Sequence, residues 1–316
     1  MVGYVARRAL QIIPVVIGIS VITWLMMSLA PGDAAEIYAR QFAENERPTP
    51  ADIERARKEL ALEGHPIEQY LRWAGRAVHG DLGRSFRSGR YVVREIMIYL
   101  PATLQLTASG ALVILVIGLP MGVVAALYHN RWPDVLARFF ALLGVGLPSF
   151  WLALLLIWLF AVQLQWLPSV GRGDWRNLIL PALALGIVGS GSYTRLLRAT
   201  MLDALSQEYI TAARARGVGP AGVVIRHALR NALIPVVTKF GLTFGALLSG
   251  AVFVETIFSW PGVGKFAVDS ISAKDYPSVQ GFVLFASLTY VAANFLIDVV
   301  YPLIDPRIGS RARASA

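Results

Sequence analysis

The sequence predicts an all-α membrane protein with six transmembrane helices and a small helical extracytoplasmic domain after the first of them. The first observation is composition. Of the 316 residues, 56% are hydrophobic and only 16% are charged, whereas about a quarter of the residues in a soluble domain carry charge. The second observation is a series of apolar runs near the length of about 20 residues that crosses a bilayer. The third is an excess of Lys and Arg in the short segments that would face the cytoplasm, which accounts for the net charge of +9 without a nucleic-acid partner.

Residues 1–30 are predicted to hold the first transmembrane helix. Arg7 and Arg8 precede an apolar run that is about twice as long as a typical signal-peptide core. Ser28-Leu29-Ala30 resembles a cleavage site, but the run is long enough to span a bilayer and is expected to be retained. The basic residues place the N-terminus in the cytoplasm.

Residues 31–99 are polar and are predicted to form the extracytoplasmic helical domain. Thr49-Pro50 followed by Asp52 predicts a helix start, with a capping side chain, a proline at the first helical position and an acid in the first turn. A second helix is expected after His65-Pro66. Two helices offer a thin core, so we expect this part to pack on the membrane domain rather than to stand alone.

The membrane core is predicted to occupy residues 100–305, with a cytoplasmic tail over residues 306–316. Pro148 is expected to bend the span that contains it, because proline leaves a backbone carbonyl without its donor. The five spans of the core are predicted at about 102–127, 136–162, 178–194, 240–258 and 281–303. Together with the first helix they give six spans and place both termini in the cytoplasm.

A long basic segment, residues 195–239, separates two of these spans and is predicted to lie in the cytoplasm. Its central part fits two helices joined by a turn, because Gly217 is suited to end the first helix and Pro220 to begin the second. One face of the first helix is predicted to be small and accessible, with residues at helical spacing: Tyr209, Ala212, Ala213 and Arg216. A helix–turn–helix fixed between two spans is suited to enter a groove of another protein.

This basic segment resembles the "EAA" coupling loop of ABC importer permeases, in the version of the dipeptide, oligopeptide and nickel group. The resemblance rests on Glu208-Tyr209-Ile210, on Ala212 to Gly217, and on His227 to Ala232 with Pro235. The general pattern begins Glu-Ala-Ala, whereas this chain reads Thr211-Ala212-Ala213 and lacks the glutamate. Further motifs resemble the same group: Leu100-Pro101-Ala102-Thr103-Leu104, Phe258 to Gly264, Asp275-Tyr276-Pro277, Asp305 to Ile308 and Gly80-Asp81-Leu82-Gly83.

The resemblance extends along nearly the whole chain and implies a binding-protein-dependent transport system inner-membrane component with the type I permease fold. Such a subunit would form the path of short peptides, of dipeptide, oligopeptide or glutathione type, across the cytoplasmic membrane. Nickel or a nickel chelate is an alternative cargo for the same architecture. The residues that would couple to the ATPases are Glu208, Tyr209, Ala212, Ala213, Arg214, Arg216, Gly217, His227, Arg230 and Asn231.

The same resemblance implies partners. They are a second homologous permease in a heterodimer, two ABC ATPase subunits and an extracytoplasmic substrate-binding protein, all acting in membrane lipid. ATP and Mg would be bound by the ATPase subunits. This chain is expected to hold no cofactor and no metal.

Several motif matches lack the context that their chemistry needs, so no enzymatic activity is predicted. Residues 217–222 match GxGxxG, but no strand precedes them. Gly264-Lys265 lacks the first glycine and the Ser or Thr of a phosphate loop, so the chain is not expected to bind ATP. Gly171-Arg172-Gly173-Asp174 resembles the motif of intramembrane aspartyl proteases, but no second aspartate occupies a matching span. The four histidines are scattered along the chain, which does not favour a metal site.

Two acidic residues lie within the predicted spans, and the sequence allows two interpretations of each. Glu255 lies near the outer end of the fifth span and Asp298 near the inner end of the sixth. Each is either a member of a structural ion pair or part of a gate, because a carboxylate in a membrane is costly unless it is paired or functional. A second functional hypothesis, an ion-coupled secondary transporter, would favour inverted repeats and charges at the membrane midplane, and the sequence shows neither clearly.

Overall fold

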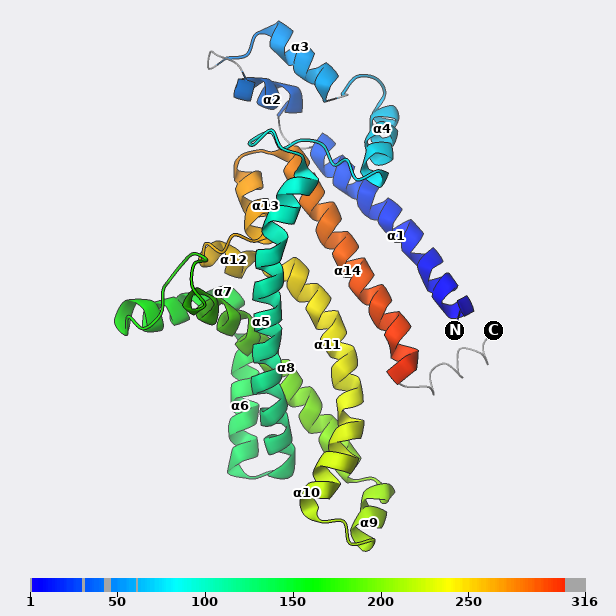
Figure 1. The fold of residues 1–316 in the computed structure, drawn as a ribbon, viewed down its shortest axis with the longest axis vertical. Helices are drawn as coiled ribbons and strands as arrows, with labels where there is room; N and C mark the ends of the chain where they lie inside the picture. Colours follow the sequence, from blue (N-terminus) through cyan, green and yellow to red (C-terminus); the bar gives the residue numbers. More distant parts are fainter. Residues whose placement is uncertain (1, 30–31, 43–46, 61, 305–316) are drawn as a thin grey trace. The chain divides into compact units, whose positions relative to one another are not determined.

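The computed structural model describes residues 2–29, 32–42, 47–60 and 62–304. These residues form helices joined by loops, with one isolated antiparallel bridge between Arg84 and Tyr91. The chain, whose helices are drawn in Figure 1, divides into two compact units. The first unit contains Leu104–Trp260 and the part of the chain that begins at Ala292, and the second contains Val2–Thr103 and Pro261–Val291.

The first unit is built around one long helix, α8 (Arg176–Leu205), which contacts α6 (Trp132–Gly146), α7 (Ser149–Leu156) and α11 (Arg230–Gly250). Small residues in α8 allow this close packing. Any side chain at Gly191 of α8 would overlap the backbone of Ala141 in α6, so only glycine permits the two helices to approach this closely.

The span predicted at 136–162 is broken into two helices. α6 ends at Gly146, and the helix formed by α7 and the π-helical segment η1 (Ile157–Gln163) leaves it at an angle of 106°. Leu147, between them, has the extended angles φ −89° and ψ 127°. Proline disfavours the helical conformation in the residue that precedes it, so Pro148 produces a sharp break where a bend was predicted.

The helices on either side of the basic segment are longer than the spans predicted there. α8 continues to Leu205 instead of ending near 194, and the helix that contains α11 begins at Pro220 instead of near 240. Most of residues 195–239 is therefore helix that continues the spans. The prediction used polarity to end each helix, but Arg, Asn and Lys side chains are compatible with helical backbone. α11 is followed by the short helix α12 (Val252–Ile257).

The second unit contains α1 (Val2–Ser28), α2 (Ala34–Phe42), α3 (Pro50–Glu59) and α4 (Pro66–Val78). It also contains α13 (Val263–Ser272), the start of α5 (Val92–Leu127) and most of α14 (Tyr276–Ile304). Residues 31–99 thus share one compact unit with parts of three apolar helices. Both predicted helix starts are confirmed. Thr49 and Asp52 form a reciprocal capping box, and His65 caps α4.

One buried carboxylate fixes the loop that follows α4. Asp275 accepts hydrogen bonds from the Ser85 hydroxyl, from the Phe86 backbone N–H at 2.9 Å, and from the Ser278 hydroxyl at 2.7 Å. It therefore ties residues 85–86 to the start of α14. Aromatic packing supports the same joint, because the Phe86 ring lies 6.5 Å from the Tyr276 ring, edge to face.

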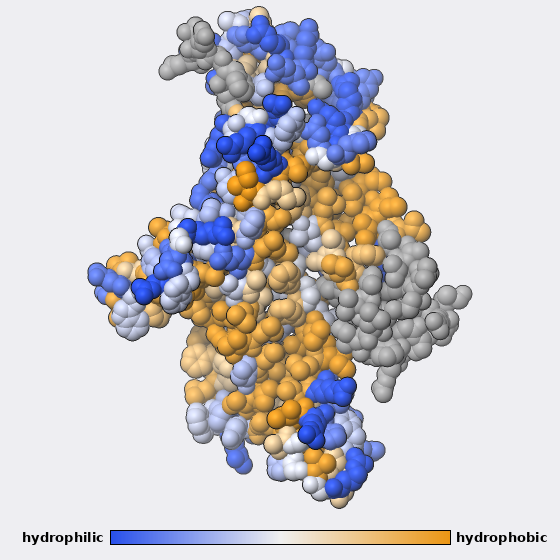
Figure 2. Space-filling model, viewed as in Figure 1, coloured by the Kyte–Doolittle hydropathy of each residue, from blue (hydrophilic) through white to orange (hydrophobic). Residues whose placement is uncertain are grey.

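Four of the described helices are long and apolar enough to cross a membrane: Val92–Leu127, Arg176–Leu205, Pro220–Leu248 and Tyr276–Leu296. The bent pair Trp132–Gly146 and Ser149–Gln163 makes a fifth if it counts as one span, and Leu10–Met26 is a shorter apolar helix. The six predicted spans fall on these six segments. In the first unit, Figure 2 shows apolar residues over the faces of α5 and α6, where Leu112, Val116, Phe139 and Phe140 are exposed.

Candidate functional site

The segment between α8 and α11, residues 206–229, is named here the elbow. It contains α9 (Glu208–Ala215), a turn, α10 (Pro220–Gly222) and the π-helical segment η2 (Val223–Leu229), and α9 and α10 lie at one end of the first unit (Figure 1). Gly217 has φ +79°, and its N–H donates to the Arg214 carbonyl at 3.0 Å. Pro220 is at the first turn of the next helix. The predicted glycine turn and proline restart are confirmed.

The inner face of α9 packs against the core of the first unit. Ile210 is fully buried in a cluster with Leu197 and Met201 of α8 and with Val223 of η2. Apolar packing from three elements fixes the position of the elbow relative to the helices that carry it.

The outer face of α9 is smaller than predicted. Tyr209, Ala212 and Arg216 are exposed, as expected for an accessible face, but Ala213 is fully buried. The expectation that Ala213 is accessible is wrong, because Ala213 lies one turn after Ile210 and turns inward with it. Exposed residues continue around the turn through Gly217, Gly219 and Pro220.

Two of the predicted coupling residues, 22 positions apart, are joined by a hydrogen bond. The Asn231 amide donates to the Tyr209 hydroxyl at 3.1 Å and to the His227 carbonyl at 2.9 Å. This bond ties α9 to the first turn of α11. Of the remaining predicted residues, Glu208, Arg214 and Arg230 are exposed, and His227 is half-buried.

The exposed side of the elbow is basic. It carries Arg214, Arg216 and Arg226, with Glu208 at the start of α9, and exposed Arg230 follows at the first position of α11. Figure 2 shows hydrophilic residues gathered at this end of the first unit, beside the apolar surface of the long helices. The elbow therefore offers a firmly supported, mostly cationic ridge whose centre is built from small residues.

Three ionic residues of the first unit were not predicted as site residues. Asp134 in α6 and Arg198 in α8 form a buried ion pair that joins the two helices. Lys239, which the sequence placed at the end of the basic segment, lies instead within α11. Its Nζ is 5.0 Å from the centre of the Tyr193 ring and 3.4 Å from the Ser192 carbonyl oxygen of α8. A charged residue inside an apolar helix is the signal that could have identified Lys239, had the helix been assigned its full length.

The two predicted membrane acids lie in different helices. Glu255 is fully buried in α12, and its carbonyl accepts a hydrogen bond from the Trp260 N–H at 2.8 Å. Complete burial favours a structural role for Glu255 over an accessible gate, because a buried carboxylate needs a partner. Asp298 lies in α14, and its side chain is outside the described residues.

The histidines do not converge on one place. His65 caps α4, His79 Nδ1 lies 2.8 Å from the Gly75 carbonyl, and His129 contacts Arg198. Within the described ranges, no group of three or more His, Cys, Asp or Glu side chains is placed to hold a metal ion. The described geometry contains no constellation for acid–base or metal chemistry near the elbow.

Two solved structures share the fold. An amino acid ABC transporter with histidines matches 68% of this chain and 94% of its own, with a TM-score of 0.52 and 18% identity. The MetNI methionine ABC transporter, in inward-facing conformations, matches 66% of this chain and 95% of its own, with a TM-score of 0.54 and 18% identity. At this identity the similarity concerns the fold, which is the type I ABC importer permease fold.

Sequence comparison extends over the whole chain. Residues 118–310 match the family "Binding-protein-dependent transport system inner membrane component", and residues 1–107 match the N-terminal family of the same components. The glutathione transport system permease protein GsiC of Escherichia coli (strain K12) is 41% identical over 308 residues, which cover 98% of this chain and 99% of GsiC. A Shigella flexneri GsiC is 40% identical over the same length. The chain therefore belongs to the binding-protein-dependent transport system inner membrane components, as an ABC importer permease of the dipeptide and oligopeptide type.

Proposed function

We propose that this permease forms the path by which short peptides of the glutathione and dipeptide type enter the cell, and that separate ATPase subunits drive it through the elbow. The observation that carries the cargo assignment is the 41% identity to GsiC over 98% of this chain. The observation that carries the coupling assignment is the elbow, since packing and the Asn231–Tyr209 bond hold it while its outer face stays exposed.

The elbow suits the transmission of movement for a physical reason. A segment can transmit a displacement only if it moves together with the helices to which it is attached. The Ile210 cluster joins α9 to α8, and Asn231 joins it to α11. A groove on an ATPase that holds Ala212 and Gly217 would therefore shift two long helices at once. ATP can bias the inward and outward states only if the ATPases bind them with different free energies.

The remaining assignments follow from this role. The elbow lies in the cytoplasm with both termini, and residues 31–99 lie outside the cytoplasmic membrane. The partners are a second homologous permease, two ATPases and a substrate-binding protein on the outer side. ATP and Mg are bound by the ATPases, and this chain has no ATPase site of its own. Cargo selection is made mainly by the binding protein, because the spans carry few charges.

The test is uptake by the complete complex in proteoliposomes, with the cognate binding protein supplied on the outer side. We expect ATP-dependent accumulation of glutathione or a dipeptide, and none when the ATPases carry a catalytic-site substitution. Accumulation that persists without ATPase activity would instead support an ion-coupled transporter. Uptake of a nickel chelate in place of either peptide would overturn the cargo assignment and leave the coupling assignment intact.

A further inference from the structure

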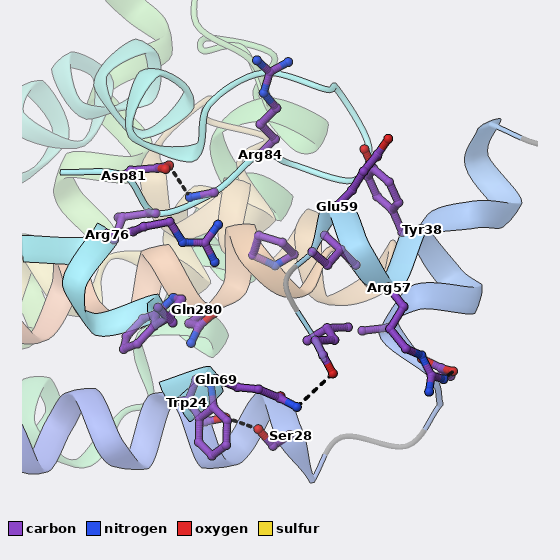
Figure 3. A pocket seen from close by; sticks show the side chains of 18 of the residues that line it. Trp24, Ser28, Tyr38, Arg57, Glu59, Gln69, Arg76, Asp81, Arg84 and Gln280 are labelled. Atoms are coloured by element: carbon purple, nitrogen blue, oxygen red, sulfur yellow. Dashed lines mark hydrogen bonds and ion pairs between the residues drawn. The ribbon is translucent and has the colours of Figure 1, made fainter. Parts of the chain in front are cut away.

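A cavity of about 820 Å³ opens in the second unit (Figure 3). Its walls come from α1, α2, α3, α4, the loop after α4 and the start of α14, and all of its lining residues belong to that unit. Trp24 and Trp73 contribute aromatic surface. The volume is in the range of cavities that hold small ligands. No residue of the elbow or of the first unit's membrane helices lines this cavity.

Most of the charged groups that line this cavity already have partners. Arg57 Nη2 lies 2.6 Å from Asp33 Oδ2. Tyr38 is hydrogen-bonded to Glu59, and burial, followed by that hydrogen bond, raises the pKa of the Tyr38 hydroxyl above its ordinary value. In Figure 3 these groups occupy one side of the cavity.

Arg84 is also engaged, although it lines the cavity. Its guanidinium stacks 4.6 Å from the centre of the Tyr91 ring, and its Nη2 donates to the Tyr91 hydroxyl at 3.2 Å. In Figure 3 the Arg84 side chain points away from the space between the walls. Arg84 is therefore not a candidate to bind a ligand there.

Two hydrogen-bond donors on the other side are not engaged. Gln280 is only 5% exposed, and its Nε2 has no hydrogen-bond partner in the described part of the chain. Arg76 makes no side-chain hydrogen bond or ion pair with any described residue, and Figure 3 shows its guanidinium directed into the cavity near Gln280. A buried donor without an acceptor is costly and calls for a ligand or water.

We propose that this cavity is a second binding site for cargo, in which Arg76 and the Gln280 amide hold the carboxylate of a short peptide. A guanidinium matches a carboxylate in charge and in planar geometry, and the neutral amide supplies a further donor without repelling Arg76. The volume suits a peptide of two or three residues. Glu59 lies on the opposite side. Its carboxylate is hydrogen-bonded to Tyr38 and carries the charge opposite to that of the amino group of the same peptide.

This inference rests on the proposed function, because it takes the cargo to be a peptide and places the site on the outer side of the membrane. The site would hold a peptide after it leaves the binding protein. This site differs from the translocation path, which would run between the membrane-spanning helices. A peptide would occupy the site without ATP.

The experiment measures equilibrium binding of radiolabelled dialanine and of radiolabelled glutathione to the purified complex, without ATP and without the binding protein. We expect Arg76→Gln to weaken binding at least tenfold and Gln280→Met to weaken it several-fold. Dialanine amide, which lacks the carboxylate, should compete at least tenfold less well than dialanine. The matched control is Arg72→Gln, on the same helix one turn earlier, because Arg72 donates to the Glu63 carbonyl and does not line the cavity. Its affinity should stay within twofold of the wild type.

Two results would overturn this site. One is the absence of binding by both probes in a complex that transports peptide when the binding protein is added, and that result leaves the proposed function intact. The other is binding that Arg76→Gln and Gln280→Met do not change, in protein whose thermal unfolding matches the wild type. If Arg76→Gln weakens only association with the binding protein, the carboxylate belongs to that protein and the cargo site is refuted. Failure of peptide uptake by the complete complex would instead count against the proposed function.

Discussion

Arg198 of α8 donates two hydrogen bonds to the carboxylate of Asp134 in the first turn of α6, with Nε 2.6 Å from Oδ1 and Nη2 2.8 Å from Oδ2. Asp134 is fully buried and accepts a third bond from the Asn130 N–H at 2.9 Å. Two parallel bonds between planar groups fix orientation as well as distance. The pair therefore sets the position of α6 against α8 near the end of α8 that leads into the elbow.

Replacing Asp134 with Asn should destabilise the permease by about 3 kcal/mol. The substitution leaves the largely buried Arg198 without its opposite charge, and breaking a buried pair from one side typically costs this much. The measurement is the free energy of unfolding of the purified subunit in mixed micelles titrated with sodium dodecyl sulfate.

The double variant Asp134→Asn with Arg198→Met separates a pair from two independent effects. If the residues act as a pair, the loss in the double variant is smaller than the sum of the two single losses. Additive losses would show that the bonds do not couple. Arg138→Met is the matched control. Arg138 lies 3.3 Å from the same carboxylate but is 45% exposed, so its loss should cost less than about 1 kcal/mol.

Asp275→Asn should release the loop at residues 85–86. The substitution removes the negative charge to which two hydroxyls and two backbone N–H groups donate. Hydrogen bonds to a charged group contribute roughly 1.5–3 kcal/mol each. Arg84, Arg87 and Arg90 in this loop are potential trypsin sites. We expect cleavage there at least tenfold faster than in the wild type, measured by mass spectrometry of the fragments.

Asp269→Asn controls for the loss of a carboxylate in the same unit. Asp269 is 38% exposed and pairs with Lys265, one turn earlier on α13, at 2.7 Å. An exposed pair of this kind contributes under about 0.5 kcal/mol, so trypsin should cut the loop at the wild-type rate. Equal acceleration by both substitutions would mean that Asp275 does not hold the loop specifically.

Local signals in the sequence were sufficient to predict the local structure. Thr49-Pro50 and His65-Pro66 mark helix starts because a cap and a proline act within one turn, and both starts are present. Gly217 and Pro220 predict the turn of the elbow for the same reason. The predicted apolar runs coincide with the four long apolar helices, with the bent pair α6 and α7, and with the shorter apolar helix Leu10–Met26. They could be located because bilayer thickness sets the length of a membrane-crossing segment.

The extent of helices and the contacts between distant residues could not be predicted in this way. Polarity marks where a helix leaves lipid and does not mark where it ends, so α8 and α11 extend beyond the predicted spans. Nothing in the local sequence of Asp134 indicates a partner 64 residues away. Helical spacing groups Ala213 with Tyr209 and Arg216 on one face of α9. The spacing does not indicate which edge of that face turns toward the core, and Ala213 is on the buried edge.

Gly217→Val should uncouple the permease from its ATPases. No atom lies within 4 Å of the position that a Cβ would take at Gly217, so the obstacle is the backbone angle φ +79° rather than space. A left-handed conformation costs an ordinary residue roughly 1–2 kcal/mol, and it is worse for a β-branched one. We expect ATP-driven peptide uptake, and stimulation of ATPase activity by the binding protein, to fall at least tenfold.

Gly217→Asn is the matched control, because asparagine tolerates positive φ best among residues with a side chain. It should retain at least half of the wild-type uptake. If valine and asparagine reduce uptake equally, the loss follows from adding a side chain to the docking surface and not from distortion of the turn. If neither reduces it, the coupling role assigned to the turn is wrong.

Lys239 should be required for transport but not for stability. Its ammonium group lies over the Tyr193 ring of α8, and the residue is part of a helix long enough to cross the membrane. A charge at such a position costs free energy, so a charge that is retained there usually has a function in transport. Lys239→Met keeps the length of the side chain and removes the charge, so we expect the free energy of unfolding to stay equal or rise while peptide uptake falls at least tenfold. Lys239→Arg keeps the charge and the contact with the ring, and it should preserve a substantial part of the uptake. Full uptake by the Met variant would show that the ammonium group only packs α11 against α8.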